Sequence, residues 1–136
     1  MKRIAIILHK HLQKGQVGNV AAILMGQASL CCPDLYDSRS ILDLTGNRHA
    51  AICYNTVVLR ASQTQIVNFG QEIRSKFPEA VCVFFSETGQ NLSNAYEEYR
   101  SLIPQKTTEE LGPVGVLIIG DDADIRSLTK KFSLLV

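Results

Sequence analysis

The sequence predicts a three-layer α/β/α sandwich built around a central mixed, largely parallel sheet. Continuous β-rich apolar runs cover residues 3–9, 80–85 and 113–120 without polar alternation, as expected for strands that are buried on both faces. The strands are followed along the chain by segments with helical periodicity, which is typical of a sheet covered by helices on both sides. With 136 residues and no repeat or linker-like tract, the chain is predicted to form a single domain over residues 1–136.

The first strand, residues 3–9, is predicted to pass through a glycine-containing loop over 12–18 into an amphipathic helix. The helix is indicated by apolar residues that recur at a helical spacing, namely Val17, Val20, Ala21, Leu24, Met25 and Ala28. Pro33 follows the end of this helix. The stripe predicts that one side of the helix packs on the sheet.

The middle of the chain is predicted to contain extended segments at 39–45, 48–54 and 56–61, with a turn at Thr45-Gly46-Asn47 and an open pairing scheme. A helix over 63–77 ends before Pro78. Residues 91–102 predict a polar, exposed helix, and 104–110 a surface connection. The last strand, 113–120, leads into a helix over 121–132 with acidic residues at its start and lysines at its end, as the helix dipole favours.

Composition excludes several classes of protein. Fourteen basic and thirteen acidic residues leave a formal charge of +1, which gives no reason to expect strong non-specific nucleic-acid binding. No segment is long and apolar enough to suggest a membrane span or a signal peptide, so a cytoplasmic protein is predicted. The four cysteines show no CxxC spacing and are expected to be reduced. We expect neither a cofactor nor a metal.

The first strand, loop and helix contain the main candidate site. Backbone N–H groups and the positive end of a helix dipole would form an anion site there, together with basic side chains and glycines. The candidate ligand-binding residues are Lys10, His11, Lys14, Gly15, Gly18 and Asn19. The competing interpretation is that the glycines only form a turn and the lysines are solvated.

Two other constellations favour a structural interpretation. His9 and His11 would share a face of a strand, as a pair of metal ligands does, but no third ligand lies nearby in the sequence. Ser86, His49 and Asp43 could be assembled into a hydrolytic triad, yet no nucleophile-elbow motif surrounds Ser86. Neither set is predicted to be a site.

Lys10-His11-Leu12, Gly15 and Gly18-Asn19-Val20-Ala21-Ala22 together resemble the opening motif of the type II peptidyl-tRNA hydrolases. The run 116–120, the acidic turn after it and the end of the chain resemble that family's last strand and helix. Glu87-Thr88-Gly89-Gln90-Asn91 stands where the family has an acidic, glycine-containing turn. The resemblance implies the family's fold, a homodimer, a role for Glu87 in the ligand site and a small anionic ligand or a tRNA end as partner.

The sequence departs from the hydrolase motif where its catalysis would reside. By position, the family's helix lysine becomes Asn19, its glutamine becomes Ile23 and the following histidine becomes Gly26. An isoleucine can neither donate nor accept a hydrogen bond, and an asparagine lacks the charge that would stabilise an oxyanion. The pattern Gly15-x-x-x-Asn19 before an Ala-Ala helix is similar to a bacterial family of unknown function with the same fold.

These observations leave three hypotheses. The first is a binding domain for a small anionic or nucleotide-like ligand, on a hydrolase-like fold that has lost the catalytic groups. The second is an ester or amide hydrolase, acting for instance on peptidyl-tRNA, in which Lys10, Asn19 and Glu87 share the work. The third is a structural domain that forms homodimers. Whether the protein is an enzyme is left open by the sequence.

Overall fold

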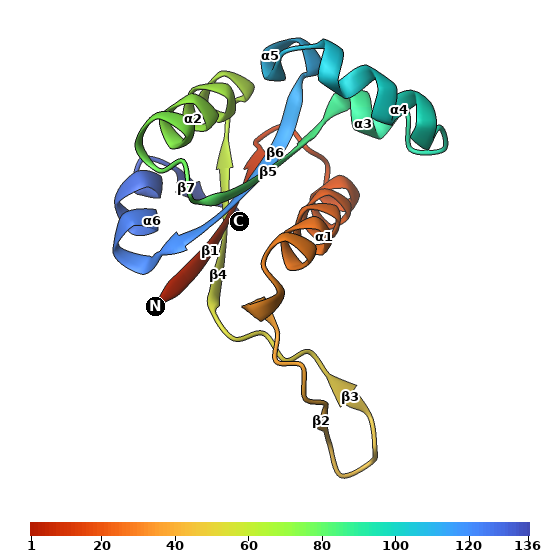
Figure 1. Cartoon of the computed structure of the whole chain (residues 1–136), viewed down its shortest axis with the longest axis vertical. Coiled ribbons are helices and arrows are strands. Elements are labelled where there is room, and N and C mark those ends of the chain that lie inside the picture. The colour runs from red at the N-terminus through yellow and green to blue at the C-terminus, as the bar shows by residue number, and fades with distance from the viewer.

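The computed structural model describes all residues, 1–136, and has a five-stranded sheet at its centre (Figure 1). The strand order is β5-β6-β1-β4-β7, so that the first strand of the chain lies in the middle. The strands span Lys2–His9 (β1), Asn55–Ala61 (β4), Val81–Ser86 (β5), Pro113–Asp121 (β6) and Ser133–Leu134 (β7). The predicted strands at 3–9, 56–61, 80–85 and 113–120 are therefore confirmed.

The sheet is mixed, as predicted, but it is not largely parallel. Only β1 and β4 pair in parallel, whereas β6 lies antiparallel to both β1 and β5, and β7 lies antiparallel to β4. The directions follow from these pairings: β1, β4 and β5 run one way and β6 and β7 the other. The carboxyl ends of β1, β4 and β5 consequently meet at one edge of the sheet, which we call the carboxyl edge.

Helices cover both faces of the sheet and make three layers (Figure 1). Helix α1 (Lys14–Cys31) packs on one face, and α2 (Gln63–Lys76) and α6 (Asp122–Thr129) pack on the other. The apolar stripe predicted for α1 is confirmed, because Val20, Leu24 and Ala28 are buried against the sheet. The helix α2 was predicted to within one residue at its end, whereas α6 is shorter than the predicted 121–132. None of the helices combines the length and the apolar character needed to cross a bilayer.

The predicted loop over 12–18 is wrong, since the helix α1 already begins at Lys14. The backbone N–H of Gln13 donates to the side-chain oxygen of Gln16 at 2.9 Å and so caps the first turn. Gly15 and Gly18 lie within the helix, where a β-carbon on either would meet nothing within 4 Å. These glycines are therefore not needed for a turn.

The segment between β5 and β6 is also more helical than predicted. It contains α3 (Glu87–Asn91), α4 (Tyr96–Leu102), a 3-10 turn η2 (Ile103–Gln105) and α5 (Thr108–Leu111). The single predicted helix over 91–102 is thus replaced by two, and the connection at 104–110 is partly helical. Helix α3 begins directly after β5 because the side chain of buried Ser86 caps it, accepting the N–H of Gly89 at 3.1 Å.

A hairpin extends far from the rest of the molecule (Figure 1). After the 3-10 turn η1 (Pro33–Leu35), the strands β2 (Ile41–Leu42) and β3 (Arg48–His49) pair antiparallel with each other alone. We call residues 37–53 the arm. Its turn contains Gly46 with a positive φ of 93°, a value that glycine adopts readily. The turn predicted at 45–47 is therefore confirmed.

Candidate functional site

A groove of about 620 Å³ lies between α1 and α3, beside the carboxyl edge of the sheet. Two of the predicted site residues, Gly15 and Asn19, line it together. They are four residues apart on α1, so they lie on the same side of the helix. The other residues that line it are Gln16, Ile23, Phe85, Gln90, Asn91 and Ser93.

The lining of this groove combines amides with an apolar patch. Gln16 and Asn19 come from α1, and Gln90 and Asn91 come from α3 across the groove. Each amide offers two donors and an acceptor, so both kinds of hydrogen bond are available to a ligand. Ile23 and Phe85 supply an apolar surface beside them. No charged side chain lines the groove.

Sequence reasoning did not identify Gln16, Gln90, Asn91 or Ser93 as site residues. Asparagine and glutamine side chains on helices form no recognisable sequence motif. In addition, the sequence did not predict that a helix begins at Glu87. The signal that could have identified α3 is Ser86, a residue type that is favoured as a helix N-cap. In the structure its side chain accepts the backbone N–H of Gly89.

Glu87 lies at the carboxyl end of β5 but not among the residues that line the groove. Its carboxylate accepts a hydrogen bond from the side chain of Gln63, the first residue of α2, at 2.8 Å. Its backbone N–H donates to the carbonyl of Gly112 at 2.7 Å. The side chain is thus bound at the edge of the sheet, next to the groove.

His9, Lys10 and His11 lie at the end of β1 on the same carboxyl edge. The Nδ1 atom of His9 accepts the backbone N–H of His11 at 3.2 Å, and the two rings lie 5.2 Å apart. Burial lowers the pKa of His9, the charge of His11 lowers it further, and the Glu87 carboxylate opposes this. His9 is therefore neutral at pH 7. No cluster of three or more His, Cys, Asp or Glu side chains is arranged to hold a metal ion.

The remaining predicted residues do not line the groove. Lys10 and Lys14 are exposed and form no ion pair, and Gly18 lies on α1 outside the lining. The Ser86, His49 and Asp43 set is not brought together. His49 binds Asp43 in the arm at 2.8 Å, while Ser86 is buried at the carboxyl edge.

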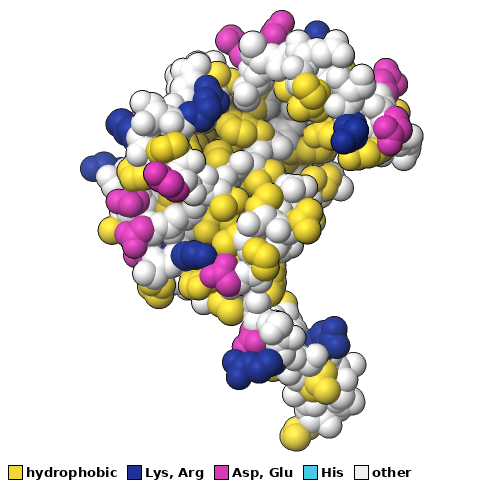
Figure 2. All heavy atoms as spheres, in the orientation of Figure 1, with side chains coloured by type: hydrophobic (Ala, Val, Ile, Leu, Met, Phe, Trp, Pro, Cys, Tyr) yellow, Lys and Arg dark blue, Asp and Glu magenta, His cyan; other side chains and the backbone are white.

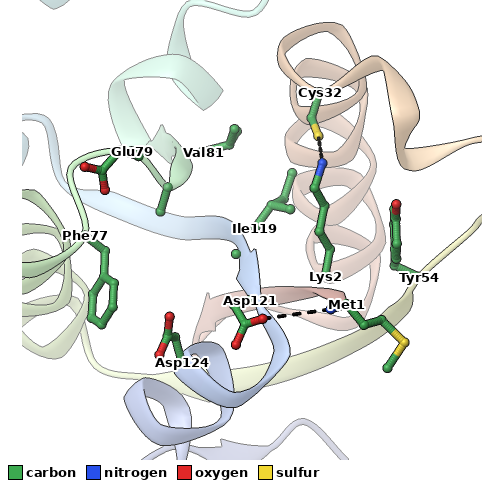
Figure 3. Close-up of a pocket in the computed structure, with 12 residues that line it drawn as sticks. Met1, Lys2, Cys32, Tyr54, Phe77, Glu79, Val81, Ile119, Asp121 and Asp124 are labelled. Atoms are coloured by element: carbon green, nitrogen blue, oxygen red, sulfur yellow. Dashed lines mark hydrogen bonds and ion pairs between the residues drawn. The ribbon is translucent and has the colours of Figure 1, made fainter.

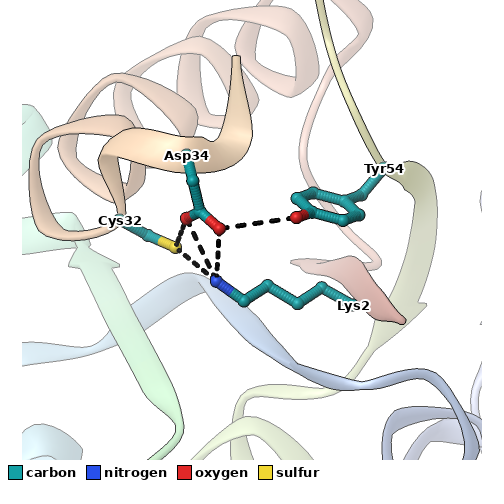
Figure 4. Close-up of polar contacts among 4 residues, drawn as sticks. All are labelled: Lys2, Cys32, Asp34 and Tyr54. Atoms are coloured by element: carbon teal, nitrogen blue, oxygen red, sulfur yellow. Dashed lines mark hydrogen bonds and ion pairs between the residues drawn. The ribbon is translucent and has the colours of Figure 1, made fainter. Parts of the chain in front are cut away.

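A second hollow, of about 500 Å³, lies at the opposite edge of the sheet (Figure 3). It is lined by apolar side chains together with the carboxylates of Glu79, Asp121 and Asp124. At its border, Lys2 donates to Asp34 at 2.8 Å, and the Cys32 thiol donates to the same carboxylate at 2.9 Å (Figure 4). Burial and the bond to Asp34 raise the pKa of Cys32 despite the nearby Lys2, so the thiol is neutral at pH 7. No sequence pattern indicated this cluster.

Comparisons with known proteins identify a family. No curated protein matches the chain. A solved structure of a protein of unknown function, Atu0240 from Agrobacterium tumefaciens strain C58, superposes with a TM-score of 0.85 at 19% identity, over 99% of this chain and 98% of that one. This likeness concerns the fold. The predicted membership of a bacterial family of unknown function is confirmed, while the likeness to peptidyl-tRNA hydrolases stays a prediction. Residues 2–136 match the model described as "Protein of unknown function (DUF2000)", and the chain belongs to that family.

Proposed function

We propose that this domain binds a small polar ligand, anionic or nucleotide-like, in the groove between α1 and α3. The observation that carries the proposal is that Gly15 and Asn19 line one hollow with Gln90 and Asn91 of a distant part of the chain. Concave sites with an apolar patch and a few converging polar groups are the usual form of small-ligand sites.

The groove suggests how such a ligand would lie. A planar, partly apolar group would rest on Phe85 and Ile23, where ring contacts are favourable. The amides of Asn19 and Asn91 would bind its polar edge from opposite sides. An anionic group would lie toward the start of α1, where the N–H groups of the first turn, the helix dipole and the unpaired Lys14 favour negative charge.

The lining supports binding over hydrolysis of an ester or amide such as peptidyl-tRNA. None of the side chains that line the groove can take up or release a proton near pH 7. The nearest carboxylate that the sequence assigned to catalysis, Glu87, binds Gln63 instead. A cytoplasmic location and a homodimer remain predictions.

A thermal-shift screen with nucleotides, inorganic phosphate and aminoacyl compounds tests the proposal. A stabilising compound should lose about 1 kcal/mol of binding free energy in Asn19→Ala, a roughly fivefold weaker Kd, because one amide hydrogen bond is lost. The matched control is Asn68→Ala, an exposed asparagine of α2 that lies outside the groove. Both variants gain the same helix propensity, so a difference between them reports the ligand.

Two results would count against this function. One is a screen in which no compound raises the melting temperature. The other is full stabilisation of Asn19→Ala by every compound that stabilises the wild type. Turnover of peptidyl-tRNA that disappears in Glu87→Gln would favour the hydrolase instead.

A further inference from the structure

The arm exposes apolar side chains that nothing in the molecule covers. Every residue from 38 to 50 is exposed, and Leu42 and Leu44 expose 59% and 109% of their surface relative to a reference residue. An isolated two-stranded hairpin is only marginally stable in water, and contiguous exposed apolar side chains commonly mark an interaction surface. The space-filling view shows hydrophobic side chains out to the free end of the arm (Figure 2).

The arm nevertheless has a defined shape, which Asp43 maintains. Its carboxylate accepts the N–H groups of Thr45 and Asn47 at 2.9 and 3.0 Å and binds the His49 ring at 2.8 Å. A preformed element loses less conformational entropy on binding than a disordered one. The arm is therefore suited to insert its leucines into a partner.

The same chain carries a hollow of matching chemistry. A depression of about 210 Å³ lies where α1 faces α3 and α4, and it has a mainly apolar lining. It adjoins the ligand groove and shares Ile23, Phe85 and Ser93 with it. Tyr96 and Ile23 expose 64% and 41% of their surface there. The residues that line it are Ile23, Phe85, Gly89, Leu92, Ser93, Tyr96 and Tyr99.

Charge complementarity supports pairing between the arm and this hollow. Arg48 on β3 has no carboxylate within ion-pair distance. Glu97 and Glu98 follow Tyr96 on α4 and also have no basic partner. In Figure 2, acidic side chains lie at the outer end of α4 with basic atoms beside them, and basic side chains lie on the arm. Opposite charges at the rim of an apolar contact set its orientation.

An arm cannot reach the hollow of its own molecule. Figure 1 shows the arm at one end of the long axis and α3 and α4 at the other. A second copy, turned end for end, would bring each arm to the other molecule's hollow. Both arms and both hollows would then be covered in one dimer. We propose that two copies form a closed, two-fold dimer in which each arm docks Leu42 and Leu44 into the hollow lined by Tyr96 of its partner. This proposal does not rest on the proposed ligand, which would compete with a docked arm for Ile23 and Phe85.

Sedimentation equilibrium at micromolar concentration tests the exchange. The wild type should be dimeric, and the arm variant Leu42→Asp and the hollow variant Tyr96→Asp should each be monomeric, because either change places a carboxylate in the apolar contact. Leu134→Asp is the matched control, because Leu134 is 61% exposed on β7, away from both surfaces, and this variant should stay dimeric. Circular dichroism melting verifies that each variant folds, and Leu44→Asp serves as a second arm variant.

Mixing the two monomeric variants distinguishes an exchange from other contacts. The Tyr96→Asp molecule retains its arm and the Leu42→Asp molecule retains its hollow, so one of the two contacts can form and a weak heterodimer should appear. The double variant alone should remain monomeric. A monomeric wild type would overturn the proposal, and so would a Tyr96→Asp variant that dimerises as well as the wild type, which would indicate contact between arms.

Discussion

The close packing of α1 on the sheet depends on Gly115 in β6, and an alanine there should destabilise the protein. A β-carbon at this position would lie 3.0 Å from atoms of Leu24, Leu8 and Val20. These three side chains are at most 1% exposed, so none can move into solvent. In Gly115→Ala these side chains must therefore give way by a few tenths of an ångström, which strains the packing between α1 and the sheet.

The size of the effect of Gly115→Ala follows from two opposing contributions. Overpacking of a close-packed core costs about 1–3 kcal/mol. Replacing a glycine within a strand returns about 0.5–1 kcal/mol, because the unfolded chain loses conformational freedom. The net loss lies between about 0 and 2.5 kcal/mol and is centred on about 1.2 kcal/mol. With an unfolding entropy of about 0.29 kcal/mol per kelvin for 136 residues, the melting temperature should fall by about 4 °C, and by no more than about 9 °C.

Urea denaturation and calorimetry of Gly115→Ala measure this loss directly. Gly26→Ala is the control, since Gly26 is an exposed position of α1 where a β-carbon would meet no atom within 4 Å. That variant should be more stable than the wild type by about 0.5–1 kcal/mol. A Gly115→Ala protein as stable as Gly26→Ala would refute the packing of α1 described above.

Two further predictions concern ionisable groups. Burial raises the pKa of Cys82 to about 11. At pH 8, ionisation alone should therefore make the alkylation of Cys82 about 100-fold slower than that of a thiol of pKa 9. Mass spectrometry of iodoacetamide-treated protein should find exposed Cys53 labelled before Cys82, and equal rates for the two would contradict this prediction. Hydrogen bonds from Cys32 and Lys2 lower the pKa of Asp34 to about 2 from 3.8, so its contribution to stability is complete above pH 4 and is lost as pH falls toward 2. The melting temperature of Asp34→Asn should accordingly depend less on pH in that range, and an unchanged profile would exclude this role.

Much of the fold could be predicted because its strands and main helices carry strong local patterns. The runs that became β1 and β6 are apolar on both faces, and these strands are central and buried. The run that became β5 was also predicted to be buried on both faces, but β5 lies at the edge of the sheet and is mostly half-buried. The stripe through Val20, Leu24 and Ala28 placed α1 against the sheet. Each of these features depends on which side chains are buried, and the spacing of apolar residues along the sequence indicates this well.

The direction of the strands could not be predicted in the same way. Alternating strands and helices suggested parallel neighbours, but the helices between β5 and β6 are short and lie beyond the carboxyl edge, and they return the chain antiparallel. The start of α1 was missed because it is capped by Gln13 and Gln16 rather than by a residue of high capping preference, and because Gly15 and Gly18 read as a loop.

The candidate site was predicted only on its α1 side. Gly15 and Asn19 were identified by motif, whereas Gln90 and Asn91 meet them through a tertiary contact that no local spacing encodes. Glu87 was expected to face the ligand, but Gln63, which is distant in the sequence, binds it at the edge of the sheet. Side chains that converge from different elements are determined by topology, not by periodicity.

The central position of β1 has a consequence for the order in which the protein folds. Its neighbours are β4, whose first residue is Asn55, and β6, whose first residue is Pro113. During synthesis the first strand must therefore remain without one partner until most of the chain has left the ribosome. Sequence-distant pairing of this kind slows folding, and it leaves one apolar edge of β1 without its neighbour until β6 has been synthesised.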